Sequence, residues 1–222
     1  MEITAVYFII LAVEIGLSLL LPSPVMRIKH KKDICSKKTR TVSSVVATSA
    51  LFGTGAFLAA HETNLFNFCI LSLFMMLSAA IVQIDARCRI IPNLCLLPML
   101  ILAGLYIGFN YNKPWVDIPA SIITMLIICM ALMALSNTAF HGYFGAGDIK
   151  YLAVCGLLFG TSAGMIGTLI GMIVTLLIYL IPMLTMKKLT MKSMIAFGPF
   201  IGLGSMIGIC CLYLPYGITA IP

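Results

Sequence analysis

Long apolar runs recur along the whole chain, and this pattern restricts the fold more than any other feature of the sequence. Most runs hold roughly 18 residues or more, which lets a helix cross a hydrocarbon layer of about 30 Å at about 1.5 Å per residue. Only 9% of the residues are charged, whereas typical soluble domains contain about 25%. We therefore expect an all-α integral membrane protein, because a soluble core cannot bury so much apolar surface.

The breaks between the runs predict a polytopic bundle of about eight transmembrane helices. The predicted segments are residues 3–21, 42–60, 65–84, 92–109, 115–136, 149–160, 164–184 and 194–214. The first run lacks a basic stretch before it, so we interpret it as a retained helix and not as a signal peptide. The segments lie so close together that residues 1–222 are expected to form a single membrane domain.

Positive charge gathers on one side of the predicted bundle. Of the 14 lysines and arginines, all but Lys113 fall on that side, which is expected to face the cytoplasm. The largest cluster is a basic cytoplasmic loop at residues 27–40, placed to contact anionic membrane lipid. The excess of positive charge thus indicates membrane orientation, and nucleic acid is not an expected partner.

The cysteines and histidines indicate no metal site. The eight cysteines contain no Cys-x-x-Cys pair and are expected to be free thiols, most of them buried. The three histidines are too scattered to bring two imidazoles to one metal ion. We expect neither a metal nor a cofactor.

Two of the seven acidic residues, Asp85 and Asp148, share a face and a depth at the cytoplasmic side. Asp85 follows the third segment, and Asp148 precedes the sixth. Glu14 lies midway along the first segment, where an ionisable residue is costly, and we expect it to be hydrogen-bonded or protonated and to face the bundle. The other acids fall in loops or at segment ends.

Structural interpretations of both aspartates stay open at this point. Asp148 is a candidate helix N-cap after a glycine-rich turn, and Asp85 is a candidate ion-pair partner of Arg87 or Arg89. A functional interpretation is that Gly145 and Gly147, which lack a Cβ, let an extended substrate strand approach the backbone beside an acid.

A catalytic interpretation follows if the two carboxyls lie together. Paired carboxylates share one proton, so one group can activate water while the other protonates the substrate. The helix dipoles predict an order, with Asp148 charged at a helix N-terminus and Asp85 neutral at a helix C-terminus.

Three stretches resemble the type IV prepilin peptidase family of membrane aspartic peptidases. Asp85 to Asn93 resembles the family's first aspartate segment, which ends in Ile-Pro, with Pro92 in the first turn of the next helix. Residues 145–150 match the Gly-x-Gly-Asp-x-Lys motif at every fixed position. Ala196 to Phe200 is similar to the Phe-Gly-Pro-Phe stretch before the family's last helix.

The resemblance implies an aspartic endopeptidase that cleaves leader peptides from prepilin or pseudopilin precursors at the cytoplasmic face of the bacterial inner membrane. It also implies short, single-activity members, such as those that serve Tad (Flp) pili or some secretion systems, because residues 27–40 replace a Cys-rich N-methyltransferase insert. The implied catalytic residues are Asp85 and Asp148. The implied supporting or substrate-binding residues are Gly145, Gly147, Lys150, Pro92, Gly198 and Pro199.

The roles of three basic residues and one rival function remain open. Lys150 either orients Asp148 or anchors its helix at the lipid headgroups, and Arg87 and Arg89 are interpreted first as topology signals. The rival function is a transporter or channel that uses the two aspartates as a proton or cation site. The absence of an inverted repeat of broken helices in the sequence argues against that rival.

Overall fold

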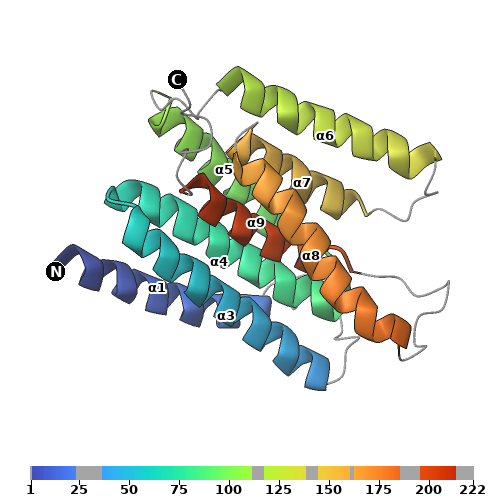
Figure 1. Cartoon of the computed structure of the whole chain (residues 1–222), viewed down its shortest axis with the longest axis horizontal. Coiled ribbons are helices and arrows are strands. Elements are labelled where there is room, and N and C mark those ends of the chain that lie inside the picture. Colours follow the sequence, from blue (N-terminus) through green and yellow to red (C-terminus); the bar gives the residue numbers. More distant parts are fainter. Residues whose placement is uncertain are drawn as a thin grey trace.

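The computed structural model describes residues 2–23, 37–111, 118–138, 145–160, 163–185 and 196–213. These residues form eight α-helices and no strand, so the predicted all-α fold is confirmed for them (Figure 1). The helices are α1 (Glu2–Leu20), α3 (Lys37–His61), α4 (Leu65–Cys88), α5 (Asn93–Phe109), α6 (Ile118–Thr138), α7 (Ala146–Phe159), α8 (Ala163–Thr185) and α9 (Gly198–Leu212).

Several helix ends differ from the prediction because polar residues extend helices beyond their apolar parts. Helix α3 begins at Lys37, inside the predicted loop 27–40, and residues 27–36 of that loop lie outside the described part. Lysine and arginine are good helix formers, which a hydropathy pattern does not register. Helix α9 begins only at Gly198, with Pro199 in its first turn, where the missing N–H has no intrahelical partner to lose.

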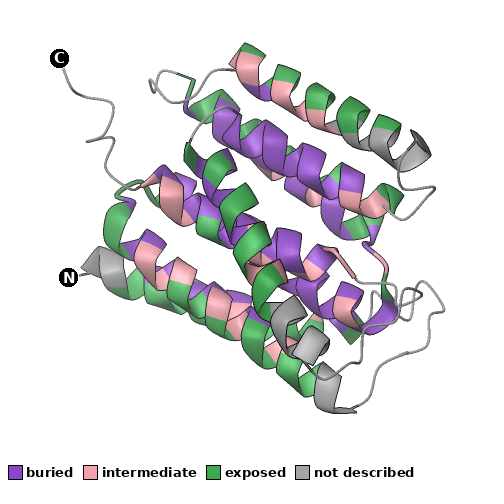
Figure 2. Ribbon diagram, turned by 45° about the vertical axis from the view of Figure 1, so that its right-hand side comes forward, coloured by how far each residue is buried: buried purple, intermediate pink, exposed green. Residues whose placement is uncertain are grey.

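Two stretches, Arg40–His61 and Leu65–Cys88, are long and apolar enough to cross a membrane. The apolar parts of the other described helices are shorter. The outer faces of α6 and α8 carry exposed aliphatic side chains, among them Ile123, Ile127, Ile170 and Ile178 (Figure 2). An outward apolar surface of this kind marks a contact with lipid or with another protein.

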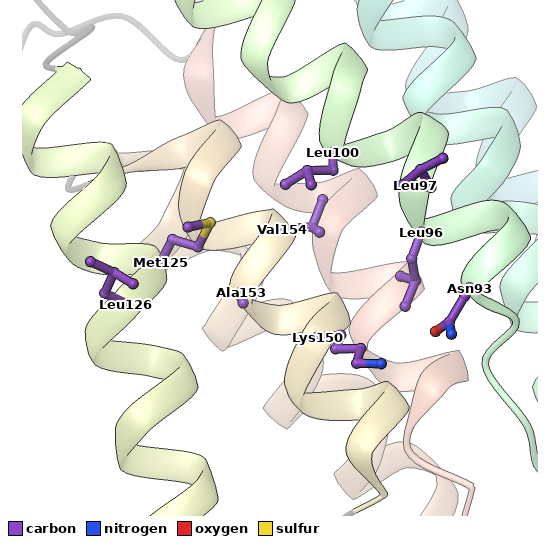
Figure 3. Close-up of a pocket in the computed structure, with 9 residues that line it drawn as sticks. All are labelled: Asn93, Leu96, Leu97, Leu100, Met125, Leu126, Lys150, Ala153 and Val154. Atoms are coloured by element: carbon purple, nitrogen blue, oxygen red, sulfur yellow. The ribbon is translucent and has the colours of Figure 1, made fainter.

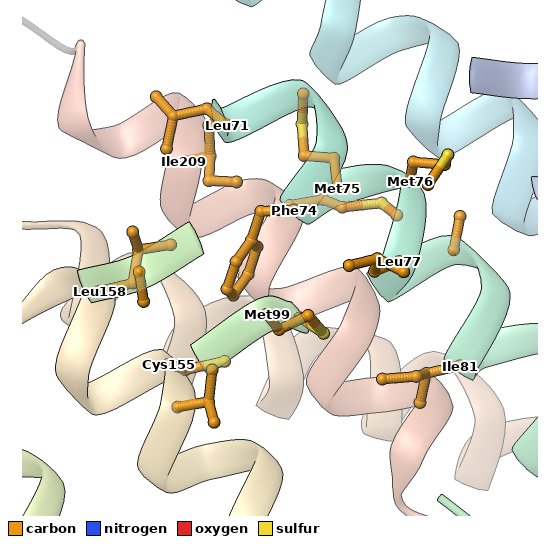
Figure 4. Packing of buried hydrophobic residues seen from close by; sticks show 14 of the residues in the cluster. Leu71, Phe74, Met75, Met76, Leu77, Ile81, Met99, Cys155, Leu158 and Ile209 are labelled. Atoms are coloured by element: carbon orange, nitrogen blue, oxygen red, sulfur yellow. The ribbon is translucent and has the colours of Figure 1, made fainter. Parts of the chain in front are cut away.

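Helix α4 occupies the centre and packs against α1, α3, α5 and α9 (Figures 1 and 2). Phe74 and Met75 of α4 meet Met99 of α5, Cys155 of α7 and Ile209 of α9 in the buried core (Figure 4). The core therefore joins α4, α7 and α9.

Helix α9 is held against α8 by close backbone contact. A Cβ added at Gly204 would lie 2.5 Å from the carbonyl oxygen of Thr168. Small residues allow helices to approach this closely, so α8 and α9 form a tightly packed pair. This packing fixes the position of the α9 N-terminus.

Candidate active site

Asp85 lies in the last turn of α4 and is 4% exposed. Its Oδ2 accepts a hydrogen bond of 3.0 Å from the backbone N–H of Gly198, which is 113 positions later in the chain. Gly198 is the first residue of α9, where backbone N–H groups have no intrahelical partner. The N-terminus of α9 is thereby joined directly to the Asp85 carboxyl.

Asp148 is the third residue of α7, and Gly145, not Asp148, occupies the N-cap position. The N–H of Asp148 donates to the Gly145 carbonyl at 3.0 Å, and the Asp148 carboxylate also has a hydrogen bond with the Gly145 backbone. This reciprocal arrangement resembles a capping box.

The structure brings the two carboxyls into one electrostatic environment, because the charges of Asp148 and Arg89 both act on Asp85. The two segments also touch through their backbones. A Cβ added at Gly147 would lie 2.9 Å from the Cβ of Ile91, six residues beyond Asp85. The start of α7 therefore rests on the segment that leaves α4.

The glycines of the motif have structural reasons to be small. Gly147 faces Ile91, and a Cβ at Gly145 would lie 3.0 Å from the Oδ2 of Asp148. Both glycines thus serve contacts within the chain, and the approach of a substrate strand beside them stays a prediction. The dipole argument also changes, because a helix N-terminus faces each carboxyl and no longer distinguishes Asp85 from Asp148.

Arg87, which the sequence suggests first as a topology signal, is buried, with 8% of its surface exposed. Its Nη2 donates to Ser44 Oγ at 2.8 Å and to Gln83 Oε1 at 3.4 Å. Gln83 in turn donates to the Ser18 carbonyl at 3.2 Å. Arg87 therefore connects the end of α4 to α3, and through Gln83 to α1, which a charge pattern cannot reveal.

Arg89 and Pro92 lie in the connection from α4 to α5. Arg89 is the C-cap of α4 and adopts a left-handed conformation with φ of 53°. Pro92 is the N-cap of α5, one position before the predicted first turn. Its fixed φ still favours the entry into the helix.

A groove of about 390 Å³ opens over α7 between α5 and α6 (Figure 3). Leu96, Ala153 and Val154 form its buried part, and Lys150 and Asn93 are its polar residues. Asn93 is the first residue of α5, and Lys150 lies on α7 two residues after Asp148. The polar end of the groove is therefore near Asp148 and near the connection that follows the Asp85 helix, α4. The groove is otherwise apolar.

Glu14 faces the bundle and is buried, as expected. Its Oε1 accepts a hydrogen bond of 2.8 Å from Ser72 of α4, and its Oε2 has no hydrogen-bond partner among the described residues. Glu14 is not among the groups whose charge acts on Asp85. The structure therefore does not bring this carboxyl into the candidate site.

The thiols agree with the sequence interpretation within the part that the structure describes. Six cysteines there are free, of which Cys88, Cys95 and Cys155 are buried and the others are partly exposed. Cys35 and the side chain of Cys129 lie outside the described part, as do His30 and His141.

Comparison with known proteins identifies the family. The model of the type IV leader peptidase family matches residues 69–181, just over half of the chain, and this stretch contains both aspartates. No curated protein and no solved structure matches the chain. The family is one of peptidases. The chain belongs to the type IV leader peptidase family.

Proposed function

We propose that this protein is an intramembrane aspartic endopeptidase that removes leader peptides from type IV prepilin-like precursors, with Asp85 and Asp148 as its catalytic pair. The observation that carries the proposal is that the start of α7, which holds Asp148, packs on the segment that follows Asp85: a Cβ added at Gly147 would lie 2.9 Å from the Cβ of Ile91. At this separation the charge of Asp148 acts on the Asp85 carboxyl. The family match supports a leader peptidase in general.

The pair can hydrolyse a peptide bond without a cofactor. One carboxylate accepts a proton from water, whose oxygen adds to the carbonyl carbon, while the neutral partner protonates the carbonyl oxygen. In the second step the proton held by the first aspartate passes to the leaving nitrogen, and the second aspartate recovers a proton from a hydroxyl of the intermediate. The C–N bond breaks, and the pair returns to its starting state.

The short helices at the site support a position below the membrane surface. Helix α7 has 14 residues and α9 has 15, which span only about 21 and 22 Å at 1.5 Å per residue. A full crossing needs about 30 Å. We propose that residues 1–222 form one multi-pass domain in the bacterial inner membrane, with the aspartates recessed from its cytoplasmic face.

The substrate would present its cleavage site at the membrane surface and an apolar helix beyond it. The groove between α5 and α6 supports docking of that helix beside the site, because the groove is apolar along its length and polar only near the starts of α5 and α7. Gly145, Gly147, Gly198, Pro92 and Pro199 would support the site by shaping the backbone, and Lys150 would lie at the polar end of the groove.

The decisive experiment supplies a candidate precursor to the purified protein in liposomes and compares wild type with the Asp85→Asn and Asp148→Asn variants. Each amide replacement is expected to abolish cleavage while the protein remains folded, because an amide neither accepts nor donates the proton. Undiminished cleavage by either variant would exclude the pair. Proton or cation flux that depends on both aspartates, without cleavage, would favour the ion-site alternative.

A further inference from the structure

Three fully buried hydroxyl groups meet between the helices that carry the candidate site. Tyr151 lies on α7, Ser78 on α4 and Ser205 on α9, and each is 0% exposed. The Tyr151 hydroxyl lies 3.4 Å from Ser205 Oγ, and the two serine oxygens lie 3.3 Å apart. Tyr151 also has a hydrogen bond with the side chain of Ser78. We call these three residues the hydroxyl cluster.

The protons of the cluster can be assigned from its other contacts. Ser78 Oγ donates to the Phe74 carbonyl at 3.0 Å, and Ser205 Oγ donates to the Gly202 carbonyl at 2.8 Å. Each serine has a single proton, and these bonds within its own helix are its shortest. The Tyr151 phenol is then the group with a proton available, which it can donate to one serine at a time. Its hydroxyl thus links α7 to α9 through Ser205 or to α4 through Ser78.

The hydroxyl cluster lies on the helix faces that lead to the aspartates. Tyr151 is three residues after Asp148, which places both on one face of α7. Ser78 precedes Asp85 by two turns on α4, and Ser205 follows Gly198 by two turns on α9, a distance of about 10 Å in each case. The same three helices that meet at the cluster therefore meet again at the site.

Helices α4, α7 and α9 approach one another closely beside the hydroxyl cluster. A Cβ added at Gly202 would lie 2.5 Å from Val82 Cγ2 and 3.4 Å from the Tyr151 hydroxyl. The surrounding contacts are largely apolar, and such contacts permit small slides and rotations that a directional hydrogen bond in a low-dielectric interior resists.

We propose that Tyr151 is a positioning residue whose hydroxyl fixes α7 against α4 and α9 and thereby sets the separation of the Asp85 and Asp148 carboxyls. This inference rests on the proposed function. Tyr151 does not touch the reacting atoms in this proposal. It acts because a water molecule held between two carboxyls tolerates only small changes in their distance.

The test compares Tyr151→Phe with Tyr7→Phe in the full chain. Tyr7 is a matched control, since it is also buried, at 1% exposure, but stacks on Phe68 in the α1–α4 contact, and its hydroxyl has no hydrogen-bond partner among the described residues. We expect Tyr151→Phe to lower kcat for precursor cleavage about tenfold, the effect of one lost hydrogen bond, with KM unchanged. Tyr7→Phe is expected to retain wild-type kcat and KM.

A pH profile separates positioning from general destabilisation. If the carboxyls move apart, their mutual repulsion weakens, and the two limbs of the bell-shaped kcat profile move closer together. Ser205→Ala is expected to lower kcat as well, and the double variant with Tyr151→Phe is expected to lose less than the sum of the separate effects, since both remove one interaction.

The positioning role is overturned if Tyr151→Phe and Tyr7→Phe have the same kcat and the same pH profile, whether both keep wild-type activity or both lose it equally. The Asp85→Asn and Asp148→Asn variants are assayed in the same membranes. If they are inactive while Tyr151→Phe is fully active, only the positioning role is wrong. If they cleave normally, the catalytic pair is wrong, and the positioning role is overturned with it.

Discussion

Replacing Gly198 by Ala tests the contact between α9 and Asp85. The added Cβ would lie 2.7 Å from Asp85 Oδ2 and 2.9 Å from its Cγ. Carbon and oxygen atoms normally stay about 3.3 Å apart or more, so the carboxyl or α9 must move by about 0.6 Å. Because a misplacement of about 1 Å can cost about 100-fold in rate, we expect kcat for precursor cleavage to fall between about 10-fold and 100-fold.

The variant is expected to remain folded. Alanine is a better helix former than glycine by about 1 kcal/mol, which partly offsets the cost of about 1–3 kcal/mol for overpacking a buried site. The net loss of stability is therefore at most about 2 kcal/mol. A thermal unfolding scan on the same liposomes would show whether lost activity comes from the site or from unfolding.

Gly104→Ala is the matched control, because Gly104 lies within α5 and an added Cβ there has no neighbour within 4 Å. This control is expected to retain full kcat. Equal activity of Gly198→Ala and Gly104→Ala would refute the reasoning, since it would mean that the α9 N-terminus does not hold Asp85 in its working position.

Three other predictions concern stability and substrate binding. Asp148 is half-buried, and a charge removed from water is costly, so Asp148→Asn should unfold at a higher temperature than wild type at about pH 7 but not at about pH 3, where carboxyls are largely protonated. A difference that does not change with pH would contradict this reasoning. Ala153→Leu would fill the floor of the groove. Because the precursor's apolar helix would then dock less well, KM for the precursor is expected to rise several-fold at constant kcat. An unaltered KM would mean that only lipid occupies the groove. Glu14→Gln keeps an acceptor for the Ser72 hydroxyl. Cleavage should therefore be unchanged, and the free energy of unfolding should stay within about 1 kcal/mol of wild type. Loss of cleavage would assign Glu14 to the mechanism.

The existence of the helices follows from the sequence, because every predicted segment corresponds to a helix in the described part of the chain. Their ends were less predictable. Hydropathy ends a segment at the last apolar residue, whereas backbone hydrogen bonding carries α4 through Asp85 to Cys88 and starts α7 before Asp148. Both aspartates are therefore inside helices, where their directions are fixed.

The proposed pairing of the two aspartates rests, in the sequence, on their shared side of the bundle and on the family motifs that contain them. The sequence contained no signal for the role of Arg87, because a buried arginine at the end of an apolar helix has the same pattern as one that faces lipid headgroups. The structure distinguishes them through Ser44 and Gln83, which lie on different helices. Tertiary neighbours of this kind are absent from a hydropathy profile.

The matched family region and the candidate site do not have the same limits. The family match ends at residue 181, yet the backbone N–H that reaches Asp85 belongs to Gly198, beyond that limit. Helix α9 also contributes Ser205 to the hydroxyl cluster and packs closely on α8. A truncated chain that ends after α8 would retain both aspartates but lose the helix that holds the first of them. The smallest unit expected to cleave a precursor therefore extends through α9.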